Sequence, residues 1–186
     1  MEKDDDRELI GRYLEGDADA FSEFYERHRR PVFAFLLSIV RQRETAEEIF
    51  QETFFAFLRS LGRLDDRSSF RPFLLRTARN LAIDRLRREK AGEKALRARA
   101  ADPFFALDPS RGSGPPGDPE RVTALLLDLP AEQREAVVLK HIGGLTFREI
   151  GELTGAPEDT AVSRYRYALK KLRAALAPGG CDDGKR

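Results

Sequence analysis

The chain has 186 residues, 41% of them hydrophobic and 35% charged, and its formal net charge is +1. Its single cysteine, Cys181, excludes an internal disulfide framework and a metal site built from several cysteines, and His28 and His141 lack the spacing of metal ligands. No signal peptide opens the sequence, and its longest apolar stretch, residues 32–40, is far too short to cross a bilayer. These features predict a cytoplasmic protein without membrane insertion, metal or other cofactor.

The charge is unevenly distributed along the chain. Acidic side chains crowd residues 2–8, whereas residues 71–99 and 164–173 are strongly basic. Separate basic stretches on a near-neutral chain indicate two distinct contacts with polyanions. Composition alone would equally allow solvated helix faces.

No stretch of the chain shows the alternation of apolar and polar residues that is typical of a strand. The whole protein is therefore expected to be all-α, and its first elements are predicted to be helices. A first helix is predicted over residues 7–14 and ends at Gly16. Asp17 or Asp19 can cap the next helix. Pro31 lacks an N–H and restricts the backbone, so it is interpreted as a joint or a new helical start.

Two further helices complete a first domain. Residues 44–61 are predicted to form a helix that ends at Gly62, residues 63–69 a polar loop whose last residue can cap a helix, and residues 70–90 a basic helix. Helical spacing distinguishes two sides of this basic helix. One side holds Leu74, Ala78, Leu81 and Arg85, and the other holds Arg76, Asn80 and Arg87.

Helix-breaking residues dominate the middle of the chain. Glycine and proline are dense within residues 102–117, which predicts a flexible linker over residues 92–118. Phe104, Phe105 and Leu107 are unusually apolar for a linker, and docking on a partner and transient contact with either domain both stay open. The predicted organisation is a domain over residues 7–91, the linker, a domain over residues 119–177 and a disordered tail over residues 178–186.

The second domain has the pattern of a helix-turn-helix. Its apolar stripe consists of Val122, Leu125, Leu126 and Leu129. After a helix over residues 131–142, Thr146 and Glu149 have the spacing of a capping box. The short helix that they open ends at Gly155, and a longer basic helix runs over residues 157–176. Helix, tight turn and longer basic helix are the parts of a DNA reader.

The last helix is predicted to have an inward and an outward side. The inward side holds Ala161, Tyr165, Ala168 or Leu169, and Leu172. The outward side holds Glu158, Asp159, Val162, Ser163 and Arg166, with Tyr167 and Lys170 alongside. Arg166 can donate two hydrogen bonds to guanine, and Ser163 can address a base or a phosphate. Glu158 and Asp159 can accept from cytosine or simply suit a helix N-terminus. The candidates for phosphate contact are Arg164, Lys171 and Arg173. A helical hairpin that does not bind DNA would give the same periodicity.

Five blocks of sequence match a known pattern. In the first domain these are residues 46–54 (AEEIFQETF) and 70–88 (FRPFLLRTARNLAIDRLRR). In the second they are residues 129–135 (LPAEQRE), 164–168 (RYRYA) and 171–173 (KLR). The first pair resembles region two, and the other three region four, of the extracytoplasmic-function sigma factors of bacterial RNA polymerase. The resemblance covers nearly everything except the linker and the chain ends. It implies a promoter-reading subunit of polymerase that is not an enzyme.

The resemblance implies roles for the first domain. In this family, the helix that here carries Glu47, Glu48, Gln51 and Glu52 grips the clamp helices of the polymerase's largest subunit. The loop before the basic helix captures a flipped base of the −10 element, and the basic helix holds the separated strand. The candidate −10 residues are Asp65, Asp66, Ser68, Arg71, Phe73, Arg76, Arg79, Asn80, Arg87 and Arg88.

Region four would read the −35 element as duplex DNA and touch the flap of the second-largest subunit. The candidate −35 residues are Thr146, Arg148, Glu158, Asp159, Val162, Ser163, Arg164, Arg166 and Lys170. An anti-sigma factor is a further candidate partner. The chain departs from the family where it lacks a tryptophan near Phe73, has Thr45 at a common aspartate position, and has Ala161-Val162 in place of an apolar-then-basic pair.

Two other functions compete with this interpretation. A stand-alone helix-turn-helix regulator would explain residues 146–173 but gives no role to Gln51 or to the basic block at residues 71–88. A nucleic-acid enzyme would need paired carboxylates near a histidine, a phosphate-cradling glycine loop or a metal cluster, and the sequence contains none of these. Asp65-Asp66 is the nearest to a carboxylate pair and is better explained as part of a solvated loop.

Overall fold

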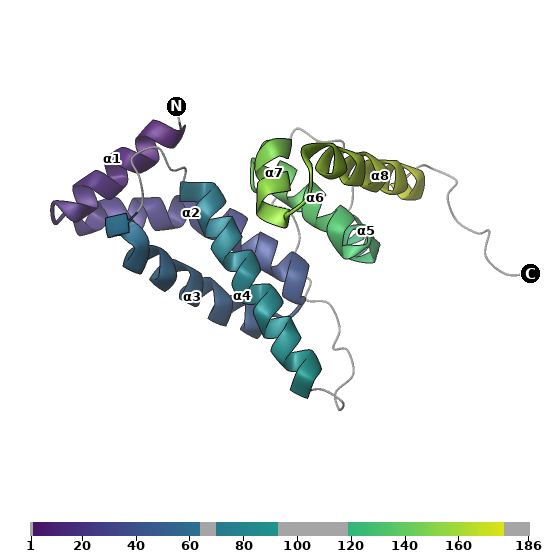
Figure 1. Ribbon diagram of the computed structural model, residues 1–186, viewed down its shortest axis with the longest axis horizontal. Helices are drawn as coiled ribbons and strands as arrows, with labels where there is room; N and C mark the ends of the chain where they lie inside the picture. The colour runs from purple at the N-terminus through teal and green to yellow at the C-terminus, as the bar shows by residue number, and fades with distance from the viewer. Residues whose placement is uncertain (1, 64–69, 93–118, 177–186) are drawn as a thin grey trace, which may run out of the picture. The chain divides into compact units, whose positions relative to one another are not determined.

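The computed structural model describes residues 2–63, 70–92 and 119–176, and every element in these ranges is a helix (Figure 1). The chain divides into two compact units, Met1–Ala100 and Ala101–Arg186. The predicted all-α class with two helical domains is therefore confirmed. Several predictions lie outside the described residues: Asp65, Asp66 and Ser68 in the loop, Phe104, Phe105 and Leu107 in the linker, Cys181, and the tail.

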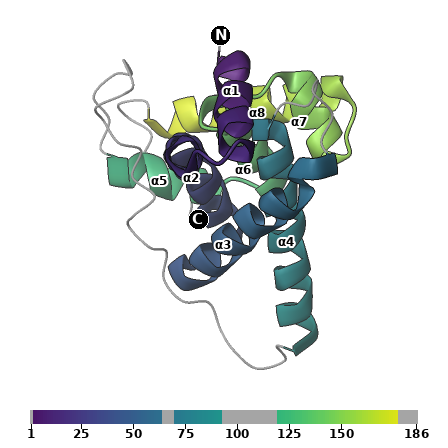
Figure 2. The ribbon, with the colours of Figure 1, turned by 90° about the vertical axis from the view of Figure 1, so that its left-hand side faces the viewer.

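The first unit is built from four α-helices and one 3₁₀ turn. These are α1 (Glu2–Leu14), α2 (Ala18–Val40), α3 (Arg43–Ser60), η1 (Leu61–Arg63) and α4 (Phe70–Gly92). Helix α1 packs on α2, while α2, α3 and α4 pack on one another, as the two perpendicular views show (Figures 1 and 2). The core of the unit therefore lies among the last three helices.

Phenylalanine rings form the centre of this core. Phe24 of α2, Phe57 of α3 and Phe70 of α4 are all buried. Their ring centroids are 5.0 Å (Phe24–Phe57), 5.8 Å (Phe24–Phe70) and 5.6 Å (Phe57–Phe70) apart. Aromatic rings at these distances attract each other beyond their burial, so one cluster fastens the three helices together.

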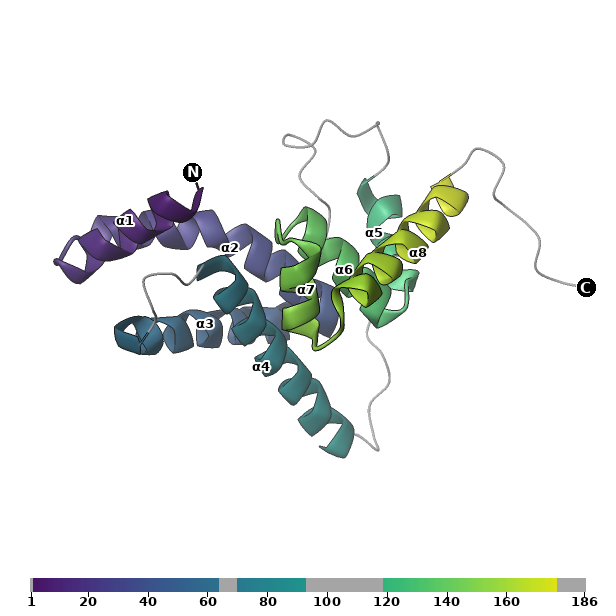
Figure 3. The same cartoon turned by 45° about the horizontal axis from the view of Figure 1, so that its top comes forward.

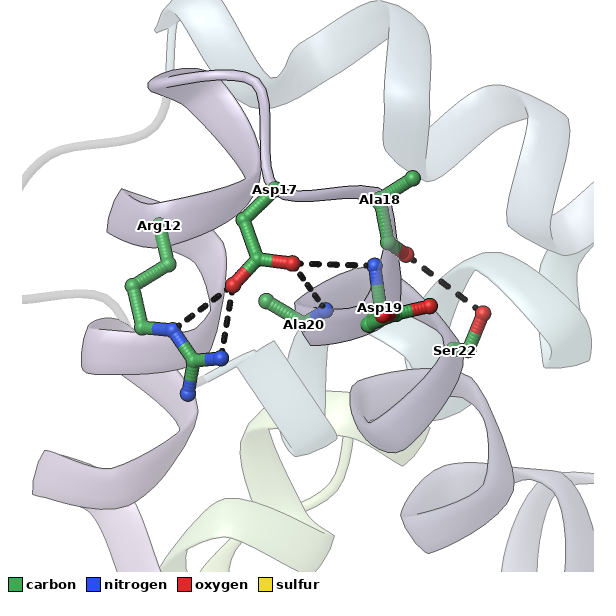
Figure 4. Close-up of polar contacts among 6 residues, drawn as sticks. All are labelled: Arg12, Asp17, Ala18, Asp19, Ala20 and Ser22. Atoms are coloured by element: carbon green, nitrogen blue, oxygen red, sulfur yellow. Dashed lines mark hydrogen bonds and ion pairs between the residues drawn. The ribbon is translucent and has the colours of Figure 1, made fainter.

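The side chain of Asp17 caps the start of helix α2 (Figure 4). One carboxylate oxygen of Asp17 accepts from the backbone N–H of Asp19 at 3.1 Å and of Ala20 at 3.3 Å, and the other oxygen accepts from Arg12 at 2.6 Å. The hydrogen bonds from Arg12 and the backbone lower the pKa of Asp17. Asp17 is thus the cap and Asp19 is not, and the contact with Arg12 also ties the end of α1 to the start of α2.

Two predicted boundaries are wrong. Pro31 is no joint, because α2 continues through it from Ala18 to Val40. The missing hydrogen bond and the ring clash cost about 3 kcal/mol. Val32, Phe35 and Leu36, which follow Pro31, are buried. Burial of each side chain contributes about 1.5–3 kcal/mol, and together these contributions outweigh the cost of the proline. Helix α1 also starts at Glu2 rather than at residue 7, because the acidic side chains there favour a helix N-terminus.

Helix α1 is held on α2 by a buried polar contact. Asp6 of α1 is buried, and its carboxylate accepts from His28 Nε2 at 2.8 Å and from Arg27 at 2.9 Å. Burial alone would raise the pKa of Asp6, but the hydrogen bonds and charges of His28 and Arg27 lower it below its ordinary value. The ionised carboxylate is therefore the form that docks α1.

The second unit contains α5 (Pro119–Asp128), α6 (Ala131–His141), α7 (Phe147–Thr154) and α8 (Glu158–Leu176). Helices α6 and α7 both pack against α8, and α7 and α8 meet at a short turn (Figure 3). Arg134 of α6 is buried and donates to the backbone oxygens of Leu127 and Leu129, each at 3.0 Å. These bonds satisfy carbonyl groups at the end of α5 and fix the corner between α5 and α6.

Candidate nucleic-acid interface

The helix-turn-helix is fixed at its entrance by the predicted capping box. The backbone N–H of Glu149 donates to Thr146 Oγ1 at 3.2 Å, and the N–H of Thr146 donates to the Glu149 carboxylate at 2.8 Å. At the other end of α7, Gly155 adopts a left-handed conformation with φ of 71°, which glycine accepts without strain. Helix α7 is therefore limited to two turns, and the chain is turned directly into α8.

A glycine that the sequence analysis did not single out sets the approach of these two helices. A Cβ atom on Gly151 would lie 2.7 Å from the backbone oxygen of Ala156 and 3.3 Å from the nitrogen of Glu158. Only glycine permits so close a contact between α7 and the turn. The one available signal was a glycine inside an otherwise helical segment, which usually has a packing reason.

Helix α8 is anchored by its inward side. Ala161 and Ala168 are buried as predicted, while Leu169 and Leu172 are half-buried. Tyr165 bonds through its hydroxyl to His141 Nε2 of α6 at 2.9 Å, and its ring lies 5.2 Å from that of Phe147 in α7.

The surroundings of His141 also determine its charge state. Partial burial and the charge of Lys140 lower the pKa of His141, so its neutral ring meets the tyrosine at neutral pH. The helix that carries the predicted reading residues is thereby held against both of its neighbours.

The outward side of α8 carries charge and one aromatic ring. Asp159, Arg166 and Lys170 are exposed, and Tyr167, with 62% of its surface exposed, lies among them. No ion pair to Arg166 is found within residues 2–63, 70–92 and 119–176. Glu158 is also exposed at the start of the helix. This stripe can approach a duplex without first breaking a contact of its own.

Other predicted −35 residues already have intramolecular partners. Ser163 is half-buried and donates to the backbone oxygen of Thr160 at 2.9 Å, and half-buried Arg164 lies 3.6 Å from Glu132. Arg148 pairs along α7 with Glu152 at 3.1 Å. Val162 is half-buried, and Thr146 is exposed but engaged in the capping box. Arg164 therefore holds α8 to α6 before any phosphate contact.

Seven of the predicted −10 residues lie on α4. Arg76, Asn80, Arg87 and Arg88 are exposed, and Arg71, Phe73 and Arg79 are half-buried. Arg88 also pairs with Asp84 one turn before it. The buried row consists of Phe70, Leu74, Leu75, Ala78 and Ala82. Of the predicted side that holds Leu74, Ala78, Leu81 and Arg85, Leu74 and Ala78 are buried, Leu81 is half-buried, and the guanidinium of Arg85 stays at the surface.

The four predicted clamp residues lie on one exposed face of α3, called here the acidic face: Glu47, Glu48, Gln51 and Glu52. Glu47 pairs with Arg43 at 2.9 Å, and Glu48 pairs with Arg85 of α4 at 3.0 Å. The carboxylates of Glu89 and Glu48 raise the pKa of Arg85. Arg85 thereby connects the acidic face to the basic helix, a contact that sequence spacing cannot reveal. Thr45 is buried beside this face and does not belong to it.

Within the part of the chain that the structure describes, no group of three or more histidine, cysteine, aspartate or glutamate side chains could hold a metal ion. Over the same residues, none of the helices combines the length and the apolar character needed to cross a membrane.

Two family descriptions match the two units in order. Sigma-70 region 2 matches residues 24–92, and Sigma-70 region 4 matches residues 120–172. RNA polymerase sigma factor CarQ of Myxococcus xanthus is 34% identical over 166 residues, which are 89% of this chain and 94% of CarQ. The chain belongs to the extracytoplasmic-function (ECF) sigma factors. ECF sigma factor SigK of Mycobacterium tuberculosis is 33% identical over 90% of this chain and 91% of SigK.

Solved structures of sigma factors have the same fold. The sigma factor RpoE in complex with the anti-sigma factor NepR from Bartonella quintana has a TM-score of 0.70 at 22% identity, over 84% of this chain and 96% of that chain. CnrH in complex with the cytosolic domain of CnrY has a TM-score of 0.64 at 25% identity, over 92% and 97%. Sigma factors are transcription initiation factors and not enzymes, and the match to region 2 excludes a stand-alone helix-turn-helix regulator.

Proposed function

We propose that this ECF sigma factor divides promoter recognition between its two units, with residues 7–91 serving the −10 element and residues 119–177 the −35 element. Residues 92–118 would connect the two. The acidic face of α3 would bind the clamp of the largest polymerase subunit, and the second unit would touch the flap of the second-largest subunit. The protein would act in the cytoplasm, where core polymerase is found.

One observation carries this proposal for the first unit. Helix α3 has an acidic outer face, while α4, packed directly against it, has a basic one. Phosphates are attracted to the basic helix and repelled by the acidic face, so a protein partner and a DNA strand can occupy the two helices together. Complementary charge steers partners and excludes wrong ones, which suits a subunit that must assemble before it reads DNA.

The exposed stripe of α8 supports the proposal for the second unit. Recognition helices place outward residues of their first turns against base edges in the major groove. Arg166 has the bidentate fork that matches guanine, and Lys170 and Lys171 provide charge for phosphates. An anti-sigma factor is proposed as a further partner, since the Bartonella chain of the same fold was solved with one.

Charge reversal on α3 tests the polymerase assignment. We expect Glu48→Lys combined with Glu52→Lys to weaken binding to sigma-free core polymerase strongly, because like charges then face the basic partner surface. Glu8→Lys combined with Glu15→Lys is the matched control, since it reverses one exposed acid on α1 and one in the turn directly after it. Circular dichroism should show unchanged helicity in both. Undiminished recovery of core by the α3 variant would refute the assignment of this face.

A further inference from the structure

Phe55 lies on the same side of α3 as the acidic face, directly beyond it, and is not part of the core. Its side chain is 60% exposed, whereas every other phenylalanine that the structure describes is buried or half-buried. No ring contact to Phe55 is found within the described parts of the chain, although the ring of its neighbour Phe54 lies 4.9 Å from that of Phe50 in a tilted arrangement. Aromatic side chains are enriched at protein interfaces relative to the rest of the protein surface.

Helical spacing places Phe55 among the acids. Phe55 follows Glu48, Gln51 and Glu52 by seven, four and three residues, the spacings at which side chains share one side of a helix. The buried residues of α3, which include Ile49, Phe50, Thr53, Phe54 and Phe57, lie on the opposite side. An exposed apolar ring therefore lies directly beyond these acids on the outer side of the helix, and Arg59 follows it on the same side by four residues.

We propose that Phe55 is the apolar anchor of the surface by which this sigma factor binds core polymerase, and that its partner is an apolar pocket bordered by basic side chains. The inference rests on the proposed function of α3 and adds to it the residue that contributes most affinity. Aromatic side chains at the centre of an interface, ringed by polar contacts that exclude water, are the usual hot spots of protein binding.

The charge around Phe55 favours a basic protein partner over a second copy of this chain or a nucleic acid. A second copy of the chain, paired symmetrically through Phe55, would bring this surface, where Arg59 is outnumbered by Glu47, Glu48 and Glu52, against an identical surface of net negative charge. A nucleic acid would bring phosphates against them. Both arrangements place like charges together, whereas a basic protein surface is complementary to the acids and still offers the ring an apolar pocket.

The experiment measures the affinity of the full chain for sigma-free core polymerase in low and high salt. Phe55→Ala is expected to raise the Kd at least tenfold, about 1.4 kcal/mol, and Phe55→Leu to restore most of the affinity. Leu14→Ala is the matched control, because Leu14 is 64% exposed but lies on α1, away from the acidic face. Its Kd should stay within twofold of the unmodified chain.

The salt dependence of binding distinguishes the contribution of the Phe55 ring from that of the charged side chains near it. The loss of affinity caused by Phe55→Ala should persist at high salt, because salt does not screen the burial of an apolar ring. The loss of affinity caused by Glu48→Lys with Glu52→Lys should become smaller at high salt, because salt screens charge–charge interactions. If Phe55→Ala binds within twofold of the unmodified chain while the charge variant is weakened, the anchor is refuted and the proposed function stands. If neither variant is weakened, the assignment of α3 to core polymerase fails as well.

Discussion

Single side chains on α8 divide between holding the helix and facing outward. Tyr165 is fixed by His141 and Phe147, while Tyr167, two residues later, is exposed with the charged side chains of the outward stripe. Arg164 contacts Glu132, whereas Arg166 points to solvent. Alternation of anchored and exposed residues of one type lets the protein hold the helix firmly while leaving its reading groups available.

Arg166 is predicted to read one base. Arg166→Ala should cost about 1–3 kcal/mol at a single position of the −35 element, because one bidentate contact is lost. Lys171→Ala is the control: it should weaken all sequences alike and lower the salt dependence of binding. The measurement is transcription by reconstituted holoenzyme from a library of −35 sequences. An unchanged −35 preference in Arg166→Ala would show that the proposed register of α8 is wrong.

Asp6 is predicted to make the docking of α1 sensitive to acid. Its pKa in the folded protein is lowered by His28 and Arg27, so its stabilisation is complete above the unfolded value of about 3.9 and is lost as pH falls through the lower, folded value. Hydrogen exchange of α1, corrected for intrinsic rates, should therefore accelerate in that acidic window.

Two substitutions check this contact. Asp6→Asn should open α1 at neutral pH and remove the acid dependence, because the amide keeps the shape but not the charge. Asp5→Asn removes a charge from an exposed neighbour on the same helix and should leave exchange unchanged. Equal protection of α1 in all three proteins would contradict a role for the buried carboxylate.

Most elements follow from local sequence signals, and the exceptions involve contacts distant in sequence. The capping box at Thr146 and the stop at Gly155 use side chains within a few residues, so spacing predicted them. The continuity of α2 through Pro31 depends on burial against α3 and α4, which no local rule contains. For the same reason, the pairing of Glu48 with Arg85 could not be predicted, although Glu48 itself was placed on an exposed face.

The faces of the helices were predicted less completely than their existence. Spacing alone placed Arg85 on the same side of α4 as Leu74, but the buried row also takes in Leu75 and Ala82 and leaves the charge of Arg85 at the surface. The sequence analysis assigned no role to Phe55. Helical spacing can place its ring on the outer side of α3, but spacing does not identify which exposed side chain meets a partner.

Gly151 is predicted to control the geometry of the helix-turn-helix. Gly151→Ala brings a methyl group within 2.7 Å of a backbone oxygen, so α7 or α8 must move. Overpacking of this kind costs about 1–3 kcal/mol. Thermal unfolding of Gly151→Ala should show this loss of stability, and the affinity of the holoenzyme for the −35 element should decrease as well.

A second alanine substitution is the control for Gly151. Gly11 lies within α1 and has no atom within 4 Å of an added Cβ. Gly11→Ala should therefore stabilise the protein by about 0.5–1 kcal/mol through helix propensity. Equal, favourable effects at both glycines would show that α7 and α8 do not need the close approach seen at Gly151.

At the scale of the whole molecule, the two reading units must reach two DNA elements at once. Elements two duplex turns apart are separated by about 70 Å. Residues 92–118 could span roughly 90–95 Å when fully extended. The segment is therefore long enough, with little to spare.

Shortening this segment tests that length limit. Deleting ten residues within residues 108–118 would reduce the reach to roughly 50–60 Å. We expect core binding to be preserved, because the acidic face is untouched, and initiation to be lost at promoters that need both elements. Run-off transcription beside a core-binding assay distinguishes the two. Normal transcription at native promoter spacing would refute the geometric argument.

The central claim is that this chain gives core polymerase its promoter specificity. The most direct measurement adds the purified protein to sigma-free core polymerase with genomic DNA and sequences the 5′ ends of the transcripts. We predict discrete start sites that require both components and share two upstream elements at constant spacing. Starts that are scattered, or unchanged when the protein is omitted, would contradict the claim.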